Sequence, residues 1–266
     1  MPGLMDGKCV LVTGPRNKWS IAWHTALALH REGANLVFSV LGDGEASNVI
    51  KLMREAGIEG PVVQCDAGDE GQVAALFTRI SEAFDGKLDG VVHAMAYANS
   101  ADLRGEFGDV SSEGFALAHE VSVYSLLRLS RAARPLLNAA GGGSIVTLSY
   151  LGAERVVPNY NIMGVAKAAL EASVRYLAYD LGPEKIRVNA ISAGPIKTLS
   201  AKGIANFDAM RRQVGEASPL RRPVEADEVG DATLFLLSSL ARGITGEILH
   251  VDGGYNVMGM MKQLDS

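Results

Sequence analysis

Two residues that could stabilise a negatively charged oxygen lie in the stretch from Ser149 to Ala178. Tyr160 precedes Lys167 by seven residues. Seven residues at 100° each make almost two helical turns, so on a helix both side chains would share one face. A phenol can donate a hydrogen bond to an oxygen that gains negative charge, and a nearby ammonium stabilises that charge. The pair therefore predicts chemistry at such an oxygen, and Lys167 could also hold ribose hydroxyls.

The spacing differs from the one found in many reductases with a nucleotide-binding fold. Those enzymes place Tyr four residues before Lys, and here Met163 has that position. A gap of seven moves the hydroxyl along the same helical face, away from the ammonium, so the active site need not be broken. Pro158 and Asn159 mark the expected start of the helix, which puts Tyr160 in its first turn.

The other tyrosines of this stretch have different expected roles. Tyr150 ends the preceding strand and should present a second phenol to the same cleft, whereas Tyr176 and Tyr179 are assigned to packing. An ordinary surface position on an amphipathic helix is the alternative for Tyr160 and Lys167. A dinucleotide-binding fold around these two residues would favour the functional interpretation.

Apolar runs and helical spacing alternate along the chain. The expected strands are 8–14, 35–40, 61–66, 88–96, 143–150, 186–192 and 246–254. The expected helices are 20–33, 45–57, 70–84, 112–137, 159–181 and 226–240. The strands are nearly continuously apolar, which is typical of a parallel sheet with helices on both faces.

The fold class predicted from this alternation is α/β, a doubly wound parallel sheet of Rossmann type with about seven strands. No linker rich in Pro, Gly or Ser divides the chain, so residues 1–266 should form a single domain. Ligands of such folds bind at the carboxyl ends of the strands. The loops to inspect therefore follow Val12, Val40, Cys65, His93, Leu148 and Ile191.

The loop after the first strand has features of a phosphate-binding turn. Gly14 allows a ligand to approach the backbone closely, and the next helix begins with N–H groups and a positive dipole end suited to a pyrophosphate. Ser20 can add a hydroxyl donor, and Arg16 and Lys18 add positive charge. The segment is not G-x-G-x-x-G, so a structural turn with solvated basic side chains stays open as the alternative.

The end of the second strand bears on the choice of nicotinamide cofactor. Leu41 and Gly42 follow this strand and Asp43 lies slightly beyond, without the Lys or Arg that would favour a ribose 2′-phosphate. NADH is therefore preferred over NADPH, although Arg16 could supply the missing charge from the neighbouring loop. Asp66, after the third strand, either hydrogen-bonds adenine or is a plain turn residue.

Net charge and residue composition restrict the possible partners and the expected cellular compartment. A net charge of −5 argues against nucleic acid or an anionic membrane as the main partner. No histidine has metal-ligand spacing, so no metal site is expected. Cys9 and Cys65 are expected to be buried free thiols, which suits a reducing cytoplasm. The N-terminus lacks a secretory pattern, and no apolar run approaches the ~20 residues that span a bilayer.

The chain resembles the NAD(P)H-dependent enoyl-acyl-carrier-protein reductases of bacterial type II fatty-acid synthesis, within the short-chain dehydrogenase/reductase superfamily. The resemblance covers nearly the whole chain, through KWSIAW, VVHAMAYA, DLRGEF, SYLGAERVVPNYNIMGVAKAALEA, IRVNAISAGPIKTLSAKGI and GEILHVDGGY. The Tyr-x6-Lys spacing with the preceding SYLGAE is highly specific. It separates this family from the carbonyl-reducing relatives with Tyr-x3-Lys.

The resemblance implies a reaction and a set of roles. NADH would deliver hydride to C3 of a trans-2-enoyl thioester on acyl carrier protein, while Tyr160 donates a hydrogen bond to the enolate oxygen and Lys167 holds the nicotinamide ribose. Tyr150 would line the acyl pocket as part of the active site, and Ala98 would contact substrate. A mobile loop at about 194–215 would cover the cofactor and the acyl chain. The family also implies a cytoplasmic homotetramer. The implied cofactor-binding residues are Gly14, Ser20, Ile21, Leu41, Asp66, Ala67, Met95, Lys167, Ile196, Lys197, Thr198, Leu199 and Ser200.

A few positions depart from the family pattern or have two interpretations. Pro15 removes one backbone N–H from the first loop, and Leu41 stands where a polar or basic residue often contacts adenosine. Met163, Ile204 and Phe207 are candidates for apolar lining of an acyl pocket, with core packing as the alternative for Met163. The competing functions are a carbonyl (ketoacyl) reductase of the same superfamily, which would need tyrosine at position 163, and a non-catalytic dinucleotide sensor.

Overall fold

One parallel sheet of seven strands organises the computed structural model, which describes residues 2–198 and 207–259. The strand order is β3-β2-β1-β4-β5-β6-β7, and every neighbouring pair is parallel. This order reverses direction between β1 and β4, so a crevice forms there at the carboxyl ends of the strands. The strands are β1 (Cys9–Thr13), β2 (Asn35–Val40), β3 (Val62–Gln64), β4 (Gly90–His93), β5 (Gly143–Tyr150), β6 (Ile186–Ala193) and β7 (Ile248–Val251).

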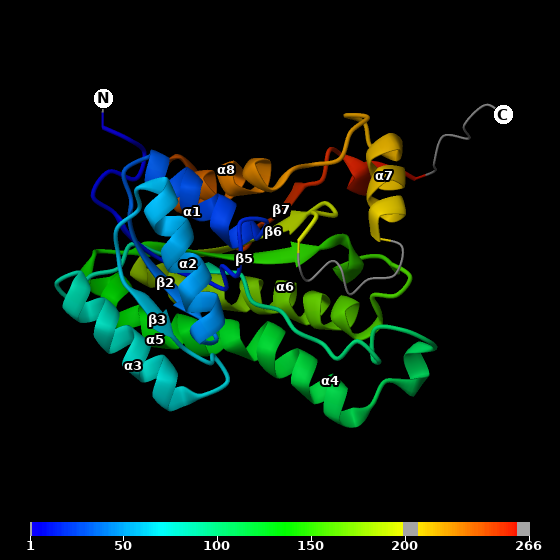
Figure 1. The fold of residues 1–266 in the computed structure, drawn as a ribbon, viewed down its shortest axis with the longest axis horizontal. Coiled ribbons are helices and arrows are strands. Elements are labelled where there is room, and N and C mark those ends of the chain that lie inside the picture. The colour runs from blue at the N-terminus through cyan, green and yellow to red at the C-terminus, as the bar shows by residue number, and fades with distance from the viewer. Residues whose placement is uncertain (1, 199–206, 260–266) are drawn as a thin grey trace.

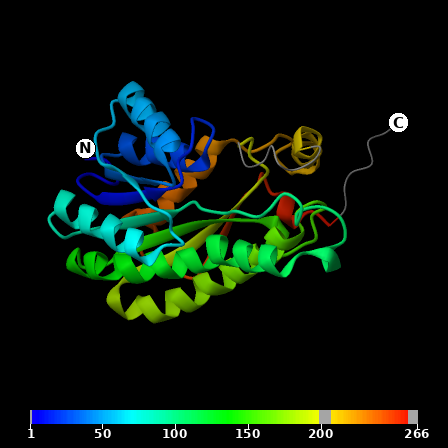
Figure 2. The same cartoon turned by 60° about the horizontal axis from the view of Figure 1, so that its bottom comes forward.

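Helices cover both faces of the sheet (Figures 1 and 2). Helices α1 (Ile21–Arg31), α2 (Asp43–Ala56) and α8 (Ala226–Leu237) pack on one face. The opposite face is covered by α3 (Glu70–Ala83), α5 (Ser125–Ala139) and α6 (Asn161–Leu181). The doubly wound α/β fold predicted from the sequence is confirmed. Two more helices, α4 (Ser112–His119) and α7 (Phe207–Ala217), lie toward the carboxyl edge of the sheet in Figure 1.

The apolar strands divide their side chains between two cores. In β1, Val10 and Val12 belong to the core under α1 and α8, whereas Leu11 belongs to the core under α3, α5 and α6. Successive side chains of a strand point to opposite faces, so a strand buried on both faces must be apolar throughout. This is the physical reason why the strand pattern was readable from the sequence.

The structure differs from the predicted elements in three places that matter for the site. The long helix expected at 112–137 is divided into α4 and α5 by a π-helical turn, Glu120–Tyr124. Helix α6 begins at Asn161, so Tyr160 is its N-cap residue and the expectation of a first-turn position was wrong. Residues 207–217 form α7, which no sequence pattern indicated and which replaces part of the loop expected at 194–215.

Surface and burial also correct some expectations. Tyr176 and Tyr179 are 76% and 83% exposed on α6, so their assignment to packing was wrong for the isolated chain. Both cysteines are free; Cys65 is buried as expected, but Cys9 is only half-buried. Across residues 2–198 and 207–259, no helix has the length and apolar character needed to cross a bilayer.

Candidate active site

The loop after β1 enters the crevice at Gly14, which lies between Ser39 of β2 and Ala94, just past β4. The Gly14 N–H donates to the Ser39 carbonyl over 2.9 Å, and its φ of +72° lies in the left-handed region. A Cβ at this position would come within 2.5 Å of the Ala94 carbonyl oxygen. Only glycine therefore fits, and the backbone is left open to a ligand at the point where the strand order reverses. A dinucleotide fits this cradle, because its pyrophosphate needs close approach to the backbone.

Ser20 shapes the same loop from its end. Its hydroxyl oxygen accepts from the backbone N–H groups of Arg16 and Asn17, each over 3.1 Å, and makes no capping bond to α1. The side chain thus folds the loop back on itself and leaves the first turn of α1 without a side-chain cap. Such a helix N-terminus favours an anion. Ile21 follows as the first residue of α1 and packs against the core on that face.

Two phenols meet at the carboxyl end of β5. The rings of Tyr150 and Tyr160 pack edge to face, with centroids 4.9 Å apart and an interplanar angle of 70°. Tyr160 is held there by a turn in which its N–H donates to the Val157 carbonyl over 3.2 Å, while Asn159 has a φ of +61°. Asparagine tolerates this conformation better than most residues. The turn and the ring contact, rather than helical periodicity, therefore place the Tyr160 side chain.

Gly152 makes room for that phenol. A Cβ on Gly152 would lie 2.5 Å from Cδ1 of Tyr160 and 3.4 Å from Cδ1 of Tyr150. A Cβ on Gly164, in α6, would lie 2.8 Å from the Gly152 carbonyl oxygen. The 3-10 turn Leu151–Ala153 can therefore press against the start of α6 only because both positions are glycine.

Lys167 extends from α6 to the same strand end. Its side chain is only 6% exposed, and Nζ donates to the Leu148 carbonyl over 2.7 Å. One turn further along α6, the buried Glu171 accepts a hydrogen bond from the Ser149 hydroxyl. Two consecutive residues of β5 thus hold the two buried charged residues of α6. Sequence reasoning missed Glu171, although its spacing of four from Lys167 was a usable signal.

Two more segments complete the crevice. Met95, just past β4, lies with Cγ 3.6 Å from where a Gly14 Cβ would be. Ala98 packs against the core under α5 and α6. The segment between them is tied to the π-helical turn, because the Ser122 hydroxyl accepts from the Tyr97 N–H over 3.1 Å and donates to the Tyr97 carbonyl over 3.3 Å.

The residues predicted to contact adenosine follow β2 and β3. Leu41 is 64% exposed after β2. The exposed Asp66 accepts from the Gly68 N–H over 2.8 Å in a tight turn after β3. Ala67 is buried, and its carbonyl accepts from the guanidinium of Arg128, which is itself 7% exposed. Arg128 was missed because its partner lies 61 residues away in the chain.

The predicted cofactor residues after β6 are only partly within the described chain. Ile196 is buried, Thr198 donates its N–H to the Ile196 carbonyl over 2.9 Å, and Lys197 is exposed and pairs with Asp208 at 3.4 Å. Leu199, Ser200 and Ile204 lie outside the described residues.

The comparisons with known proteins identify a family. The family model described as enoyl-(acyl carrier protein) reductase matches residues 14–256. The chain belongs to this family. It is 50% identical over 257 residues to the enoyl-[acyl-carrier-protein] reductase [NADH] FabI of Bacillus cereus, covering 96% of this chain and 99% of the relative.

Solved structures of other family members have the same fold. The enoyl reductase of Bacillus cereus with NADP+ and indole naphthyridinone superposes with a TM-score of 0.94 at 49% identity, covering 97% of this chain and all of that one. The enoyl reductase of Anaplasma phagocytophilum in complex with NAD gives 0.93 at 45% identity, covering 98% of both chains. Both nucleotides thus occur among enoyl reductases of this similarity.

Burial changes the acid–base properties of the candidate site. It raises the pKa of Tyr160 above its ordinary value of 10, with a smaller contribution from the adjacent Tyr150, whose own pKa burial raises to about 12. Burial lowers the pKa of Lys167 to about 8, and the carboxylate of Glu171 opposes this shift. At neutral pH the site therefore presents a protonated phenol and an ammonium. Both are donors suited to an oxygen that gains negative charge.

A buried histidine lies close to this ammonium. His93, the last residue of β4, is hydrogen-bonded to the hydroxyls of Thr147 and Ser125 at 2.7 and 2.8 Å. Burial, and then the charge of Lys167, lower its pKa to about 3, so the imidazole is neutral. It ties β4 to β5 and α5 and does not titrate in the working range. Among residues 2–198 and 207–259, no cluster of His, Cys, Asp or Glu side chains could hold a metal.

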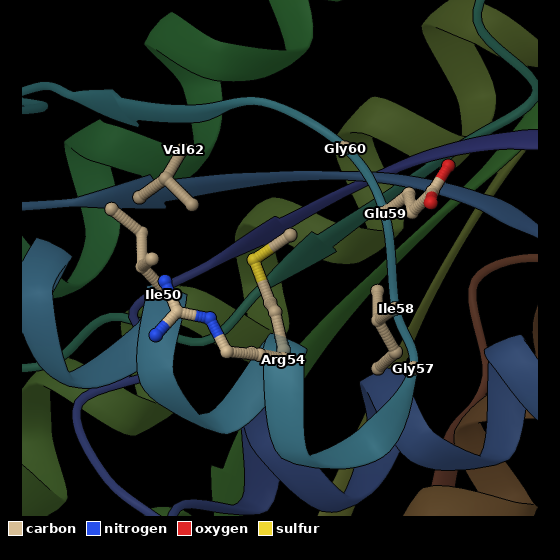
Figure 3. A pocket seen from close by; sticks show the side chains of 8 residues that line it. Ile50, Arg54, Gly57, Ile58, Glu59, Gly60 and Val62 are labelled. Carbon is tan, nitrogen blue, oxygen red and sulfur yellow. The ribbon is translucent and has the colours of Figure 1, made fainter.

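A hollow of about 560 Å³ lies away from these residues, at the amino end of β3 (Figure 3). Figure 3 shows that α2 and the segment leading into β3 supply its walls. The lining residues are Ile50, Met53, Arg54, Gly57, Ile58, Glu59, Gly60 and Val62. Because dinucleotides bind at the carboxyl ends of the strands, this hollow has no part in the site.

The glycine beside the two phenols offers a test of how the site is built. Gly152→Ala should lower turnover by roughly 10- to 100-fold, because the added methyl displaces the Tyr160 ring and a misplaced donor loses much of its effect. Steady-state kinetics measure this. Gly108→Ala is the matched control, since a Cβ there meets nothing within 4 Å. Equal kinetics for Gly152→Ala and the parent enzyme would contradict the close fit.

Proposed function

We propose that this chain reduces the trans-2 double bond of enoyl thioesters on acyl carrier protein with NADH, in the elongation cycle of fatty-acid synthesis. Membership of the enoyl reductase family supports the reaction. The observation that carries it is the meeting of Tyr160, Tyr150 and Lys167 at the end of β5. The first relative is named as NADH-dependent, which supports the choice of NADH.

The proposed roles follow from what each side chain can do. NADH, when bound, would supply a hydride to C3 of the substrate, and C2 of the resulting enolate would then take up a proton. Tyr160 donates a hydrogen bond to the thioester oxygen as negative charge develops on it, and its raised pKa keeps it protonated. Lys167 orients the nicotinamide ribose through its ammonium. The ring of Tyr150 packs against Tyr160 and fixes its direction while lining the acyl pocket.

The residue at position 163, where carbonyl reductases have their catalytic tyrosine, argues against a ketoacyl reductase. Met163 is 7% exposed and packs in the core under α5 and α6. A thioether there cannot protonate an alkoxide. The non-catalytic sensor is also disfavoured, because both the phenol and the ammonium are retained beside the crevice.

The chain's partners and assembly are part of the same proposal. The family name supports acyl carrier protein as the carrier of the substrate. We propose a homotetramer in the cytoplasm, supported by the exposed aromatic side chains of Tyr176 and Tyr179 on α6, which a second copy could cover. The remaining cofactor and substrate residues, including the covering segment at 194–215, keep the roles that the family resemblance implies.

The decisive experiment compares two thioesters with each nicotinamide cofactor. The chain should oxidise NADH with crotonyl thioester at least ~10²-fold faster than with acetoacetyl thioester, since Tyr160 and not residue 163 supplies the donor. Loss of nucleotide absorbance measures both rates. Faster reaction with acetoacetyl thioester would favour the ketoacyl reductase, and reaction with neither substrate would favour the sensor.

A further inference from the structure

The turn after β2 carries acidic side chains at the place that recognises the adenosine ribose in dinucleotide folds. Asp43 and Glu45 lie in the first turn of α2, and this turn contains no Lys or Arg. Asp43 accepts a hydrogen bond from Gln64 and so faces the neighbouring strand β3. Glu45 is directed elsewhere, back toward the end of β2.

Glu45 joins two loops that both border the crevice. Oε2 accepts from the Leu41 N–H over 3.1 Å, and Oε1 pairs with Nε of Arg16 at 2.6 Å. The Arg16 N–H donates in turn to the Ser20 hydroxyl, which shapes the phosphate-binding loop. The Glu45 side chain is 20% exposed and that of Arg16 is 50% exposed. The carboxylate is therefore held in place while the guanidinium remains accessible.

This ion pair decides what the turn can offer to the two cofactors. A guanidinium beside the ribose would bind a 2′-phosphate well, because Arg donors match phosphate oxygens. Here the cation is already neutralised, and a dianionic phosphate would also be repelled by the carboxylate. A 2′-hydroxyl meets neither obstacle, since Glu45 has acceptor capacity left for it.

We propose that Glu45 is the specificity-determining residue that selects NADH against NADPH, by holding Arg16 in an ion pair at the adenosine ribose. The inference rests on the proposed function only in taking a nicotinamide dinucleotide as the ligand. It also corrects the expectation that Arg16 supplies a free positive charge. Because solved family members contain either nucleotide, the choice must lie in residues of this kind and not in the fold.

The test is direct binding of NADH and NADPH, followed by the fluorescence of the reduced nicotinamide. Glu45→Gln keeps an oxygen for the Leu41 N–H but removes the charge, so the ratio of the NADPH to the NADH dissociation constant should fall by about 10- to 100-fold. Arg16→Met leaves the Glu45 carboxylate without its cation and should raise the same ratio. In the double variant, most of the fall in the ratio caused by Glu45→Gln should disappear.

A matched pair of controls exists on α3. Arg79 and Glu82 form an exposed ion pair at the same 2.6 Å distance, away from the crevice. Glu82→Gln and Arg79→Met should leave the ratio unchanged. The proposal would be overturned if the ratio is unchanged in Glu45→Gln, or if it falls equally in the double variant that lacks Arg16.

The binding assay separates this proposal from the proposed function. If the parent chain fails to reduce enoyl thioesters but Glu45→Gln shifts the nucleotide ratio, the reaction is wrong and the role of Glu45 stands. If the parent chain reduces enoyl thioesters and the ratio does not move, the role of Glu45 is wrong and the reaction stands.

Discussion

Tyr160→Phe is expected to lower turnover of an enoyl thioester by about 10²–10⁴-fold while the NADH dissociation constant changes little. The substitution keeps the ring that packs against Tyr150 and removes only the hydroxyl that would donate to the enolate oxygen. Steady-state kinetics and nucleotide fluorescence measure the two quantities separately. The raised pKa of Tyr160 means that the loss should be similar across the range from pH 6 to 9.

Two controls distinguish a lost donor from a disturbed pocket. Tyr176→Phe removes an equivalent hydroxyl from an exposed position of the same helix and should leave turnover unchanged. Tyr150→Phe keeps the ring contact and should cost much less than Tyr160→Phe, because Tyr150 is proposed to line the pocket. Full activity of Tyr160→Phe on enoyl thioesters would remove this residue from the mechanism.

Lys167→Met is expected to weaken NADH binding by roughly 10- to 100-fold, the effect of losing hydrogen bonds from a charged donor. Methionine fills most of the buried volume but cannot donate to ribose hydroxyls. Nucleotide fluorescence measures the affinity, and thermal unfolding shows whether the variant is folded. Lys185→Met, at an exposed position after α6, is the control and should bind NADH like the parent. Unchanged affinity in Lys167→Met would refute the assigned role.

The lowered pKa of Lys167 predicts how NADH affinity depends on pH. NADH affinity should fall as the pH rises through about 8, where the ammonium loses its proton, and Lys167→Met should lack this step. Between about pH 8 and 10.5 the unfolded chain binds this proton more tightly than the folded chain. The contribution of Lys167 to the free energy of unfolding therefore increases with pH in that window. If NADH affinity falls in this pH window, loss of folding stability caused by Lys167 cannot be the reason.

Much of the fold followed from local patterns in the chain. Apolar strands alternating with helices predicted the doubly wound sheet, because a strand buried on both faces must be apolar at every position. Gly14 was singled out for its place after the first strand, and its backbone conformation requires glycine there. The helix at 207–217 was missed, because this stretch was assigned to the loop expected at 194–215.

The amino-acid sequence by itself determined the fold class, the family and the types of residue that could do the chemistry. These depend on short-range periodicity and on the SYLGAE segment with its Tyr-x6-Lys spacing. Only the tertiary structure decided how the groups meet: Tyr160 is placed by a turn and by the Tyr150 ring, and Glu45 is paired with Arg16. Such contacts join residues from different elements, and no local pattern encodes which side chains the packing of those elements will bring together.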